Sequence, residues 1–187
     1  GGKVFLLGWR RPVNDRMAWN ADATRMPAKM HSQYLRRLFL NDDLSEGRYP
    51  VDGRPVSLGG ITLPTFCVGT ETDHVAPWRS VYKLHNLSPA EITFVLTSGG
   101  HNAGIVSEPG RPNRRYRART RPAGGNHYQS PEEWVQTTQV QEGSWWPEWV
   151  AWLRKRSGEP VKPPATGAPA KGYKAVDDAP GRYVMEK

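Results

Sequence analysis

The chain has 187 residues, of which 37% are hydrophobic and 24% are charged, and its formal net charge is +8. This length and composition are those of a globular chain with a sizeable core, which excludes an intrinsically disordered protein. No apolar run approaches the roughly 20 residues that cross a bilayer, so we expect no membrane span. The single cysteine excludes an internal disulfide and fits a reducing compartment such as the cytoplasm.

The first 60 residues predict one helix and one hairpin. Apolar residues recur at three- and four-residue spacing from Ala28 onward, so we expect a helix that ends near Asn41. Asp52 and Gly53 favour a tight turn between two short strands, at residues 48–51 and 54–58. A polar loop separates the helix from this hairpin.

The central part of the chain predicts a strand, a helix and a second strand. Two apolar runs, at 63–69 and 92–97, each end in a glycine-containing turn, and a helical segment at 76–86 lies between them. An ionisable residue follows each run: Asp73 after the first and His101 after the second. Because ligands of open α/β sheets bind outside the carboxyl ends of the strands, we expect a site at these two strand ends.

An aspartate followed by a histidine is the order of the second half of an α/β-hydrolase triad. In such a triad the histidine takes the proton of the nucleophile, and the acid orients the imidazole. A surface aspartate and an unrelated loop histidine remain the alternative. The sequence contains no Gly-x-Ser-x-Gly or Gly-x-Cys-x-Gly elbow. Cys67 lies inside the first strand, so we interpret it as a structural residue of the core.

Six arginines fall within residues 111–121, in a stretch that is flanked by proline and glycine and has no helical period. We interpret this stretch as a solvated loop. Binding of an anionic ligand or cofactor phosphate, and contact with a polyanion or a granule surface, stay open as alternatives. No known nucleic-acid module surrounds the run, so we expect no nucleic-acid partner.

Two further helices are predicted before the composition changes. One begins at Ser130, with a proline at its first position and acidic residues in its first turn. The other spans 144–156 and places three tryptophans on one face, which would pack on the sheet: Trp145, Trp149 and Trp152. Beyond Gly158 the Pro- and Ala-rich composition predicts an extended tether, followed by an end-piece at 173–184 that docks on the body or on a second subunit.

Sequence blocks along the chain resemble the polyhydroxyalkanoate synthase family. They are WNADATRMPA (19–28), YLR with the asparagine that follows it (34–41), TDHVAPW (72–78), FVLTSGGHNAGIVSEPG (94–110), GSWWPEWVAWL (143–153) and APGRYV (179–184). The resemblance extends from about Asn14 onward. It implies an α/β fold, the C-terminal part of an α/β-hydrolase fold with parallel strands and flanking helices, which is incomplete without the upstream half.

The resemblance also implies a reaction. Family members are acyltransferases that polymerise (R)-3-hydroxyacyl-CoA into a polyester and release coenzyme A, without a cofactor or a metal. Asp73 and His101 match the aspartate and histidine of the family triad, and the cysteine nucleophile is expected upstream of this chain. The family aspartate is also thought to activate the 3-hydroxyl of the substrate.

Four more residues gain a candidate role from the resemblance. His74 and Asn102, which follow the two triad residues, are candidates for substrate binding, with a structural role as the alternative for His74. Trp19 and Asn41 match family positions in the cap, where dimer contact and chain exit are discussed. Packing and loop capping are the alternative for these two.

The resemblance divides the chain into three parts: a cap remnant and its return to the core (1–60), the C-terminal half of the catalytic core (61–157), and a tether with a docking tail (158–187). It implies a homodimer at cytoplasmic polyester granules, with the hydroxyacyl-CoA substrate, the growing polyester and granule-associated proteins as partners. We expect the chain alone to be inactive. A serine hydrolase or polyester depolymerase, and a non-enzymatic basic module that binds granules or polyanions, are the alternatives.

Overall fold

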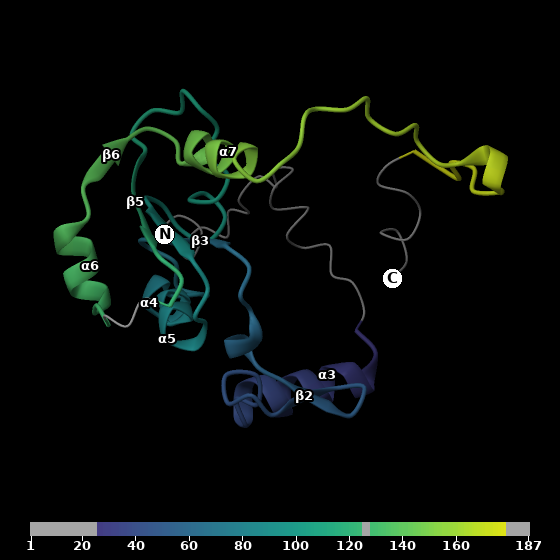
Figure 1. Cartoon of the computed structure of the whole chain (residues 1–187), viewed down its shortest axis with the longest axis horizontal. Coiled ribbons are helices and arrows are strands. Elements are labelled where there is room, and N and C mark those ends of the chain that lie inside the picture. The colour runs from purple at the N-terminus through teal and green to yellow at the C-terminus, as the bar shows by residue number, and fades with distance from the viewer. Residues whose placement is uncertain (1–25, 125–127, 179–187) are drawn as a thin grey trace, which may run out of the picture. The chain divides into compact units, whose positions relative to one another are not determined.

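The structure of the chain is a computed structural model, which describes residues 26–124 and 128–178 (Figure 1). Trp19 and the block at 179–184 lie outside the described residues. The chain divides into two compact units. Residues 34–160 form the larger unit, which contains a four-stranded sheet with helices on both faces.

The sheet has the strand order β3-β4-β5-β6. Strands β3 (Thr65–Thr70) and β4 (Ile92–Thr97) are parallel, as the central pattern predicts. Strand β5 (Arg115–Arg121) runs antiparallel to β4, and β6 (Val140–Glu142) runs antiparallel to β5. The expectation of parallel strands is therefore correct for β3 and β4 only, and the sheet as a whole is mixed.

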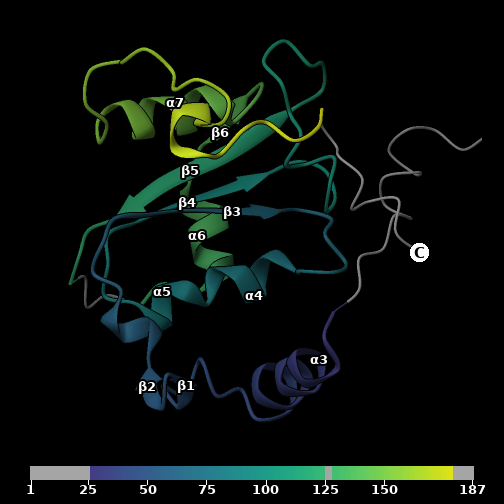
Figure 2. The ribbon, with the colours of Figure 1, turned by 90° about the vertical axis from the view of Figure 1, so that its right-hand side faces the viewer.

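Helices α4 (Trp78–Tyr82), α5 (Leu84–Leu87) and α6 (Pro131–Thr137) cover one face of the sheet (Figure 2). The rings of Tyr82, Phe94 and Trp134 meet edge to face there, with centroids 5.1 to 6.1 Å apart. This aromatic cluster fixes α4 and α6 on β4, and it stabilises the fold through both burial and ring geometry.

On this face one predicted helix is divided into two, and another begins at the residue where the sequence predicts it. The helix predicted at 76–86 forms as α4 and α5, because the Lys83 N–H bonds to the Ser80 carbonyl in a tighter turn. Helix α6 begins as predicted: the Ser130 side chain accepts from the Glu133 N–H, and the Glu133 side chain accepts from the Ser130 N–H. This capping box satisfies donors that the first turn of a helix leaves free.

Helix α7 (Trp146–Arg154) covers the opposite face (Figure 2). The Trp145 ring stacks on Phe66 at 6.2 Å between centroids, and Trp152 meets the same ring edge-on at 5.6 Å. Trp149 is 40% exposed and contacts Trp145 at the rim. Two of the three tryptophans predicted to share a face therefore pack on the sheet. With both faces covered and both edges paired, all six residues of β4 are buried.

The prediction of a solvated loop at 111–121 is wrong over most of this stretch, because residues 115–121 form β5. The arginines alternate with Tyr116, Ala118 and Thr120, so they share one side of the strand. Each of the six arginines donates a hydrogen bond to a protein group, and the acceptors are Glu71, Ser98, Val106, Glu108, Gln129, Thr137 and the end of α5. The guanidinium groups of these arginines therefore bind other groups of the same chain.

The remaining elements are short. The helix predicted from Ala28 begins as α3 (Ala28–Tyr34) and continues as the π-helix η1 (Leu35–Leu40). The predicted hairpin is formed by β1 (Tyr49–Val51) and β2 (Arg54–Val56), and its turn residues have φ values of +48° and +76°, which an Asp-Gly turn tolerates. Two further 3-10 turns are present, η2 (Leu58–Gly60) and η3 (Pro169–Lys171). Residues 160–165 have no regular structure and are exposed, as the tether composition predicts.

Candidate functional site

The carboxyl ends of β3 and β4 lie at the same edge of the sheet, because these two strands are parallel and in register. Asp73 lies in the turn after β3 and His101 in the turn after β4. The structure brings the two side chains together, with 2.9 Å between His101 Nδ1 and Asp73 Oδ2. The two residues that the sequence singles out therefore form a hydrogen-bonded pair.

The Asp73 carboxylate is only 7% exposed and accepts four hydrogen bonds. Its Oδ1 accepts from the backbone N–H groups of Val75 (2.8 Å) and Ala76 (2.9 Å). Its Oδ2 accepts from His101 and from the Thr70 hydroxyl (3.3 Å). The Ala76 N–H is the main cause that lowers the pKa of Asp73 to about 2; His101 and the Val75 N–H add to it, and burial opposes it. The carboxylate is therefore ionised at neutral pH.

The His101 side chain is 48% exposed, so one edge of its ring is open to solvent. Because the carboxylate can only accept, Nδ1 carries the proton, and Nε2 of the neutral ring keeps a lone pair. The turn that holds the residue needs glycine, since Gly99 has a φ of +107°. Such a ring can take a proton at Nε2 while the carboxylate at Nδ1 stabilises the resulting cation.

The other predicted site residues are less closely connected to this pair. His74 is exposed and Asn102 is half-buried, and within residues 26–124 and 128–178 no side-chain hydrogen bond joins either to Asp73 or His101. Asn41 follows η1, where its N–H bonds to the Arg36 carbonyl and its own carbonyl accepts from Arg48. Its described contacts are those of a loop cap.

Cys67 lies in the middle of β3, away from the strand end, and packs against the cluster around Phe94. Burial raises the pKa of its thiol to about 11. A thiol with that pKa is almost fully protonated at neutral pH, and the thiolate is the reactive form. The structural role expected for Cys67 agrees with this environment.

Thr70 is a residue of this site that the sequence does not reveal. It is buried at the last position of β3, and its hydroxyl donates to the oxygen of Asp73 that also binds His101. A threonine at the end of a strand is ordinary, since β-branched residues favour strands. Only the turn that returns the Asp73 side chain onto Thr70 gives that hydroxyl a second role.

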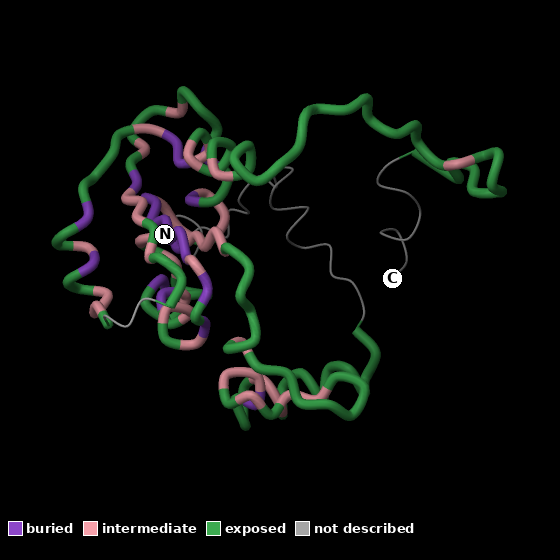
Figure 3. The backbone as a smooth tube through the Cα atoms, viewed as in Figure 1, coloured by how far each residue is buried: buried purple, intermediate pink, exposed green. Residues whose placement is uncertain are grey.

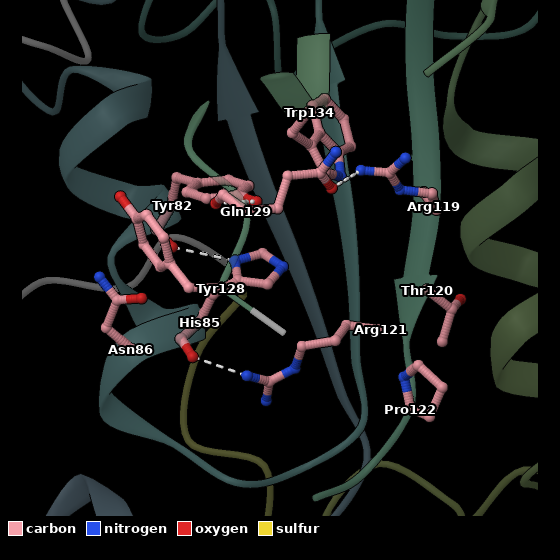
Figure 4. Close-up of a pocket in the computed structure, with 10 residues that line it drawn as sticks. All are labelled: Tyr82, His85, Asn86, Arg119, Thr120, Arg121, Pro122, Tyr128, Gln129 and Trp134. Atoms are coloured by element: carbon pink, nitrogen blue, oxygen red, sulfur yellow. Dashed lines mark hydrogen bonds between the residues drawn. The ribbon is translucent and has the colours of Figure 1, made fainter. Parts of the chain in front are cut away.

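A separate cavity of about 350 Å³ lies between α5, α6 and β5 (Figure 4). Arg121 is paired with Ile92, the first residue of β4, so the cavity lies at the opposite end of that strand from His101. Arg119, Gln129 and Trp134 line the side of the cavity that lies away from Arg121 (Figure 4). No motif in the sequence predicts a site there.

The polar groups of this cavity bond mainly to the protein itself. The Arg121 guanidinium donates to the carbonyls of His85 (2.6 Å), Ser88 (2.7 Å) and Ala90 (2.7 Å), which follow or end α5. The His85 ring stacks on Tyr82 at 4.1 Å, and burial lowers its pKa. Arg121 therefore holds the end of α5, where carbonyl groups lack helical partners.

No group of three or more metal-ligating side chains is placed to hold an ion in the part of the chain that the structure describes. In the same residues, no helix has the length and apolarity that crossing a membrane requires. Figure 3 shows that buried residues concentrate in the sheet and the segments packed on it. The candidate site is the hydrogen-bonded pair of Asp73 and His101 at the ends of β3 and β4.

No family model matches the chain. The chain is 36% identical over 184 residues to the poly(3-hydroxyalkanoate) polymerase subunit PhaC of Cupriavidus necator, which covers 98% of this chain and 30% of that protein. It is 39% identical over 185 residues to the poly(3-hydroxyalkanoate) polymerase of Methylorubrum extorquens, or 98% of this chain and 29% of that protein. For polymerase 2 of Ectopseudomonas oleovorans the identity is 35% over 183 residues, or 98% and 32%. The chain thus spans less than a third of the length of these curated relatives, and over nearly its whole length its sequence is similar to poly(3-hydroxyalkanoate) polymerases.

Proposed function

We propose that this chain supplies the base and the acid of the catalytic triad of a polyhydroxyalkanoate polymerase with an α/β-hydrolase fold. The reaction joins (R)-3-hydroxyacyl units from their coenzyme A thioesters into a polyester. The observation that carries the proposal is the hydrogen bond between His101 and Asp73 at the common end of two parallel strands. The similarity to polymerases over nearly the whole chain supports the choice of reaction.

In the proposed mechanism His101 Nε2 takes the proton of a cysteine thiol that another part of the polymerase provides. The thiolate attacks the thioester carbonyl, the bond to coenzyme A sulfur breaks, and His101 returns the proton to that sulfur. The acyl group is then held on the cysteine. Cys67 is not this nucleophile, because it is partly buried within β3 and its thiol has a pKa of about 11.

Chain extension needs a base for the 3-hydroxyl of the next unit. A carboxylate has about four acceptor positions, and all four on Asp73 are occupied by Thr70, Val75, Ala76 and His101. A pKa of about 2 also makes this carboxylate a weak base. We therefore assign the hydroxyl proton to His101 Nε2, and to Asp73 the orientation and charge stabilisation of the imidazole.

A serine hydrolase or depolymerase would use the same pair, and the family relation favours the polymerase over it. The basic-module alternative relies on the arginines at 111–121. Because all six already bond to groups of the protein, a salt-dependent polyanion surface has little support there. The three-part division at 60 and 157, the homodimer and the location at cytoplasmic granules belong to the same family-based proposal.

Coenzyme A release from 3-hydroxybutyryl-CoA tests the proposal. The assay compares this chain alone with a chimaera in which the chain replaces the matched part of the Cupriavidus necator polymerase. We expect no release by the chain and release by the chimaera, reduced by about 10²–10⁴-fold in His101→Gln. Cys67→Ala is the control and leaves the rate of the chimaera unchanged. Release by the chain alone, lost in Cys67→Ala, would contradict the proposal, as would full activity of the His101→Gln chimaera.

A further inference from the structure

The turn that carries His101 is attached to the start of α7 by three side chains. The indole N–H of Trp145 donates to the Gly104 carbonyl at 3.0 Å, and that of Trp146 donates to the Ile105 carbonyl at 2.9 Å. The Ser144 hydroxyl donates to the carbonyl of Ser107. We propose that Trp145 and Trp146 are positioning residues for His101, a role whose catalytic meaning rests on the proposed function.

Gly104 is the point through which this attachment reaches both members of the pair. Its N–H donates to the Gly100 carbonyl at 2.8 Å, just before His101, while its carbonyl accepts from Trp145. A Cβ at this position would lie 2.5 Å from the Thr70 side chain, so only glycine fits there. Thr70 in turn donates to Asp73. A shift of Gly104 is therefore transmitted to the histidine turn and to the carboxylate.

Trp145 provides a rigid support for this turn. Its side chain is 5% exposed, it stacks on Phe66, and it belongs to the cluster with Val95 and Tyr116. Its indole N–H donates to the carbonyl of Gly104, which is a buried residue. A buried carbonyl without a hydrogen-bond partner would destabilise the fold. His101, by contrast, is half exposed and gains little from packing of its own.

Trp146 separates the positioning role from simple core packing. Its side chain is only partly buried, so burial alone gives a weaker reason for an indole at this position. Its N–H is nevertheless directed at the carbonyl next to the one that Trp145 binds. Two consecutive indoles that bind two consecutive carbonyls fix the orientation of the turn as well as its location.

The test measures the tautomer of His101 in this chain, which requires no catalytic activity. Ring ¹⁵N shifts are recorded on histidine-labelled chain at a pH of about 8.5, two units above the ordinary histidine pKa, and His101→Gln assigns the signals. We expect the Nδ1–H form in the unmodified chain. In Trp145→Phe and Trp146→Phe the two ring shifts converge, because a displaced ring loses its preference for one tautomer.

Trp134→Phe is the matched control, since Trp134 is as deeply buried but packs on the other face of the sheet. It should lower the unfolding midpoint without changing the His101 shifts. Unchanged shifts in both positioning variants, or an equal change in Trp134→Phe, would overturn the inference. If Trp145→Phe does not fold, the less buried Trp146→Phe decides alone.

The chimaera keeps this inference separate from the proposed function. There Trp146→Phe should lower kcat by as much as about 10²-fold at unchanged KM, as misplaced catalytic groups do. Converged shifts in the chain combined with no activity in any chimaera would contradict the proposed function but leave the positioning role supported. Unchanged shifts would reject the positioning role even if the chimaera is active.

Discussion

The Asp73 carboxylate accepts four hydrogen bonds, and protonation weakens each of them. In the folded chain its pKa is about 2, below the value of about 3.9 for an unfolded chain. A group whose pKa is lower in the folded state stabilises the fold above its unfolded pKa. This contribution is complete above about pH 4 and is lost as the pH falls through about 2.

Asp73→Asn tests this dependence on pH. The amide is the same size and keeps an acceptor for the Val75 and Ala76 N–H groups, but it cannot titrate in this range. We expect the unmodified chain to unfold at a higher urea concentration than the variant at pH 5. The difference should shrink as the pH falls towards 2. A difference that is constant between these two pH values would mean that the fold does not depend on the ionised carboxylate.

Cys67 gives a second prediction at the scale of a single residue. With a pKa of about 11 its thiolate fraction at pH 8 is on the order of 10²-fold lower than that of an ordinary cysteine of pKa about 8.5. Iodoacetamide should therefore modify the native chain at least about 10²-fold more slowly than the chain in urea. Equal rates would place this thiol outside the core.

Among the elements, the end of α5 depends on a residue far from it in sequence. The Arg121 guanidinium binds three carbonyl groups there, and each would lose its partner in Arg121→Ala. Hydrogen bonds from a charged donor contribute more than neutral ones, so we expect a loss of about 2–4 kcal/mol in the free energy of unfolding.

The matched control for this substitution is Arg111→Ala. Arg111 bonds to Glu108 and to the Val106 carbonyl near the surface, so its loss should be below about 1 kcal/mol. Chemical unfolding of the two variants measures the difference. Equal losses would show that Arg121 has no special role at the end of α5.

Elements whose signals are local were predictable from the sequence. The apolar runs of β3 and β4, the proline and acidic first turn of α6 and the Asp-Gly turn each depend on neighbouring residues alone. Strand β5 was missed although RYRARTR alternates strictly, because its arginines suggested solvent. What makes it a strand is a set of distant partners, such as Glu71 and the end of α5, which only the fold assembles.

The candidate site divides in the same way. The order of Asp73 and His101 at two successive strand ends predicted their approach, because the topology of a strand–helix–strand unit places those ends together. The supporting residues Thr70, Gly104 and Trp145 act through backbone groups or through a turn. No sequence motif records contacts of that kind, so the structure was needed to find them.

At the scale of the whole chain, β3 forms one edge of the sheet, and no strand among the described residues pairs with its outer side. The N–H groups of Thr65 and Glu71 bond to carbonyls at the two ends of β4. Because bonding alternates along a strand, Cys67 and Gly69 point their N–H groups at β4, while Phe66 and Val68 point theirs outward. An edge of this kind is a template for pairing with another chain.

Amide hydrogen exchange resolves the two sides of this strand. At low protein concentration we expect slow exchange at Cys67 and Gly69 and fast exchange at Phe66 and Val68, since unpaired amides are open to water. As the concentration rises, a second copy should pair with the edge, so that the outward amides become protected and the sedimentation coefficient increases. Uniform protection of all four amides at the lowest concentration would contradict this prediction, because it would mean that the chain itself covers the edge of β3.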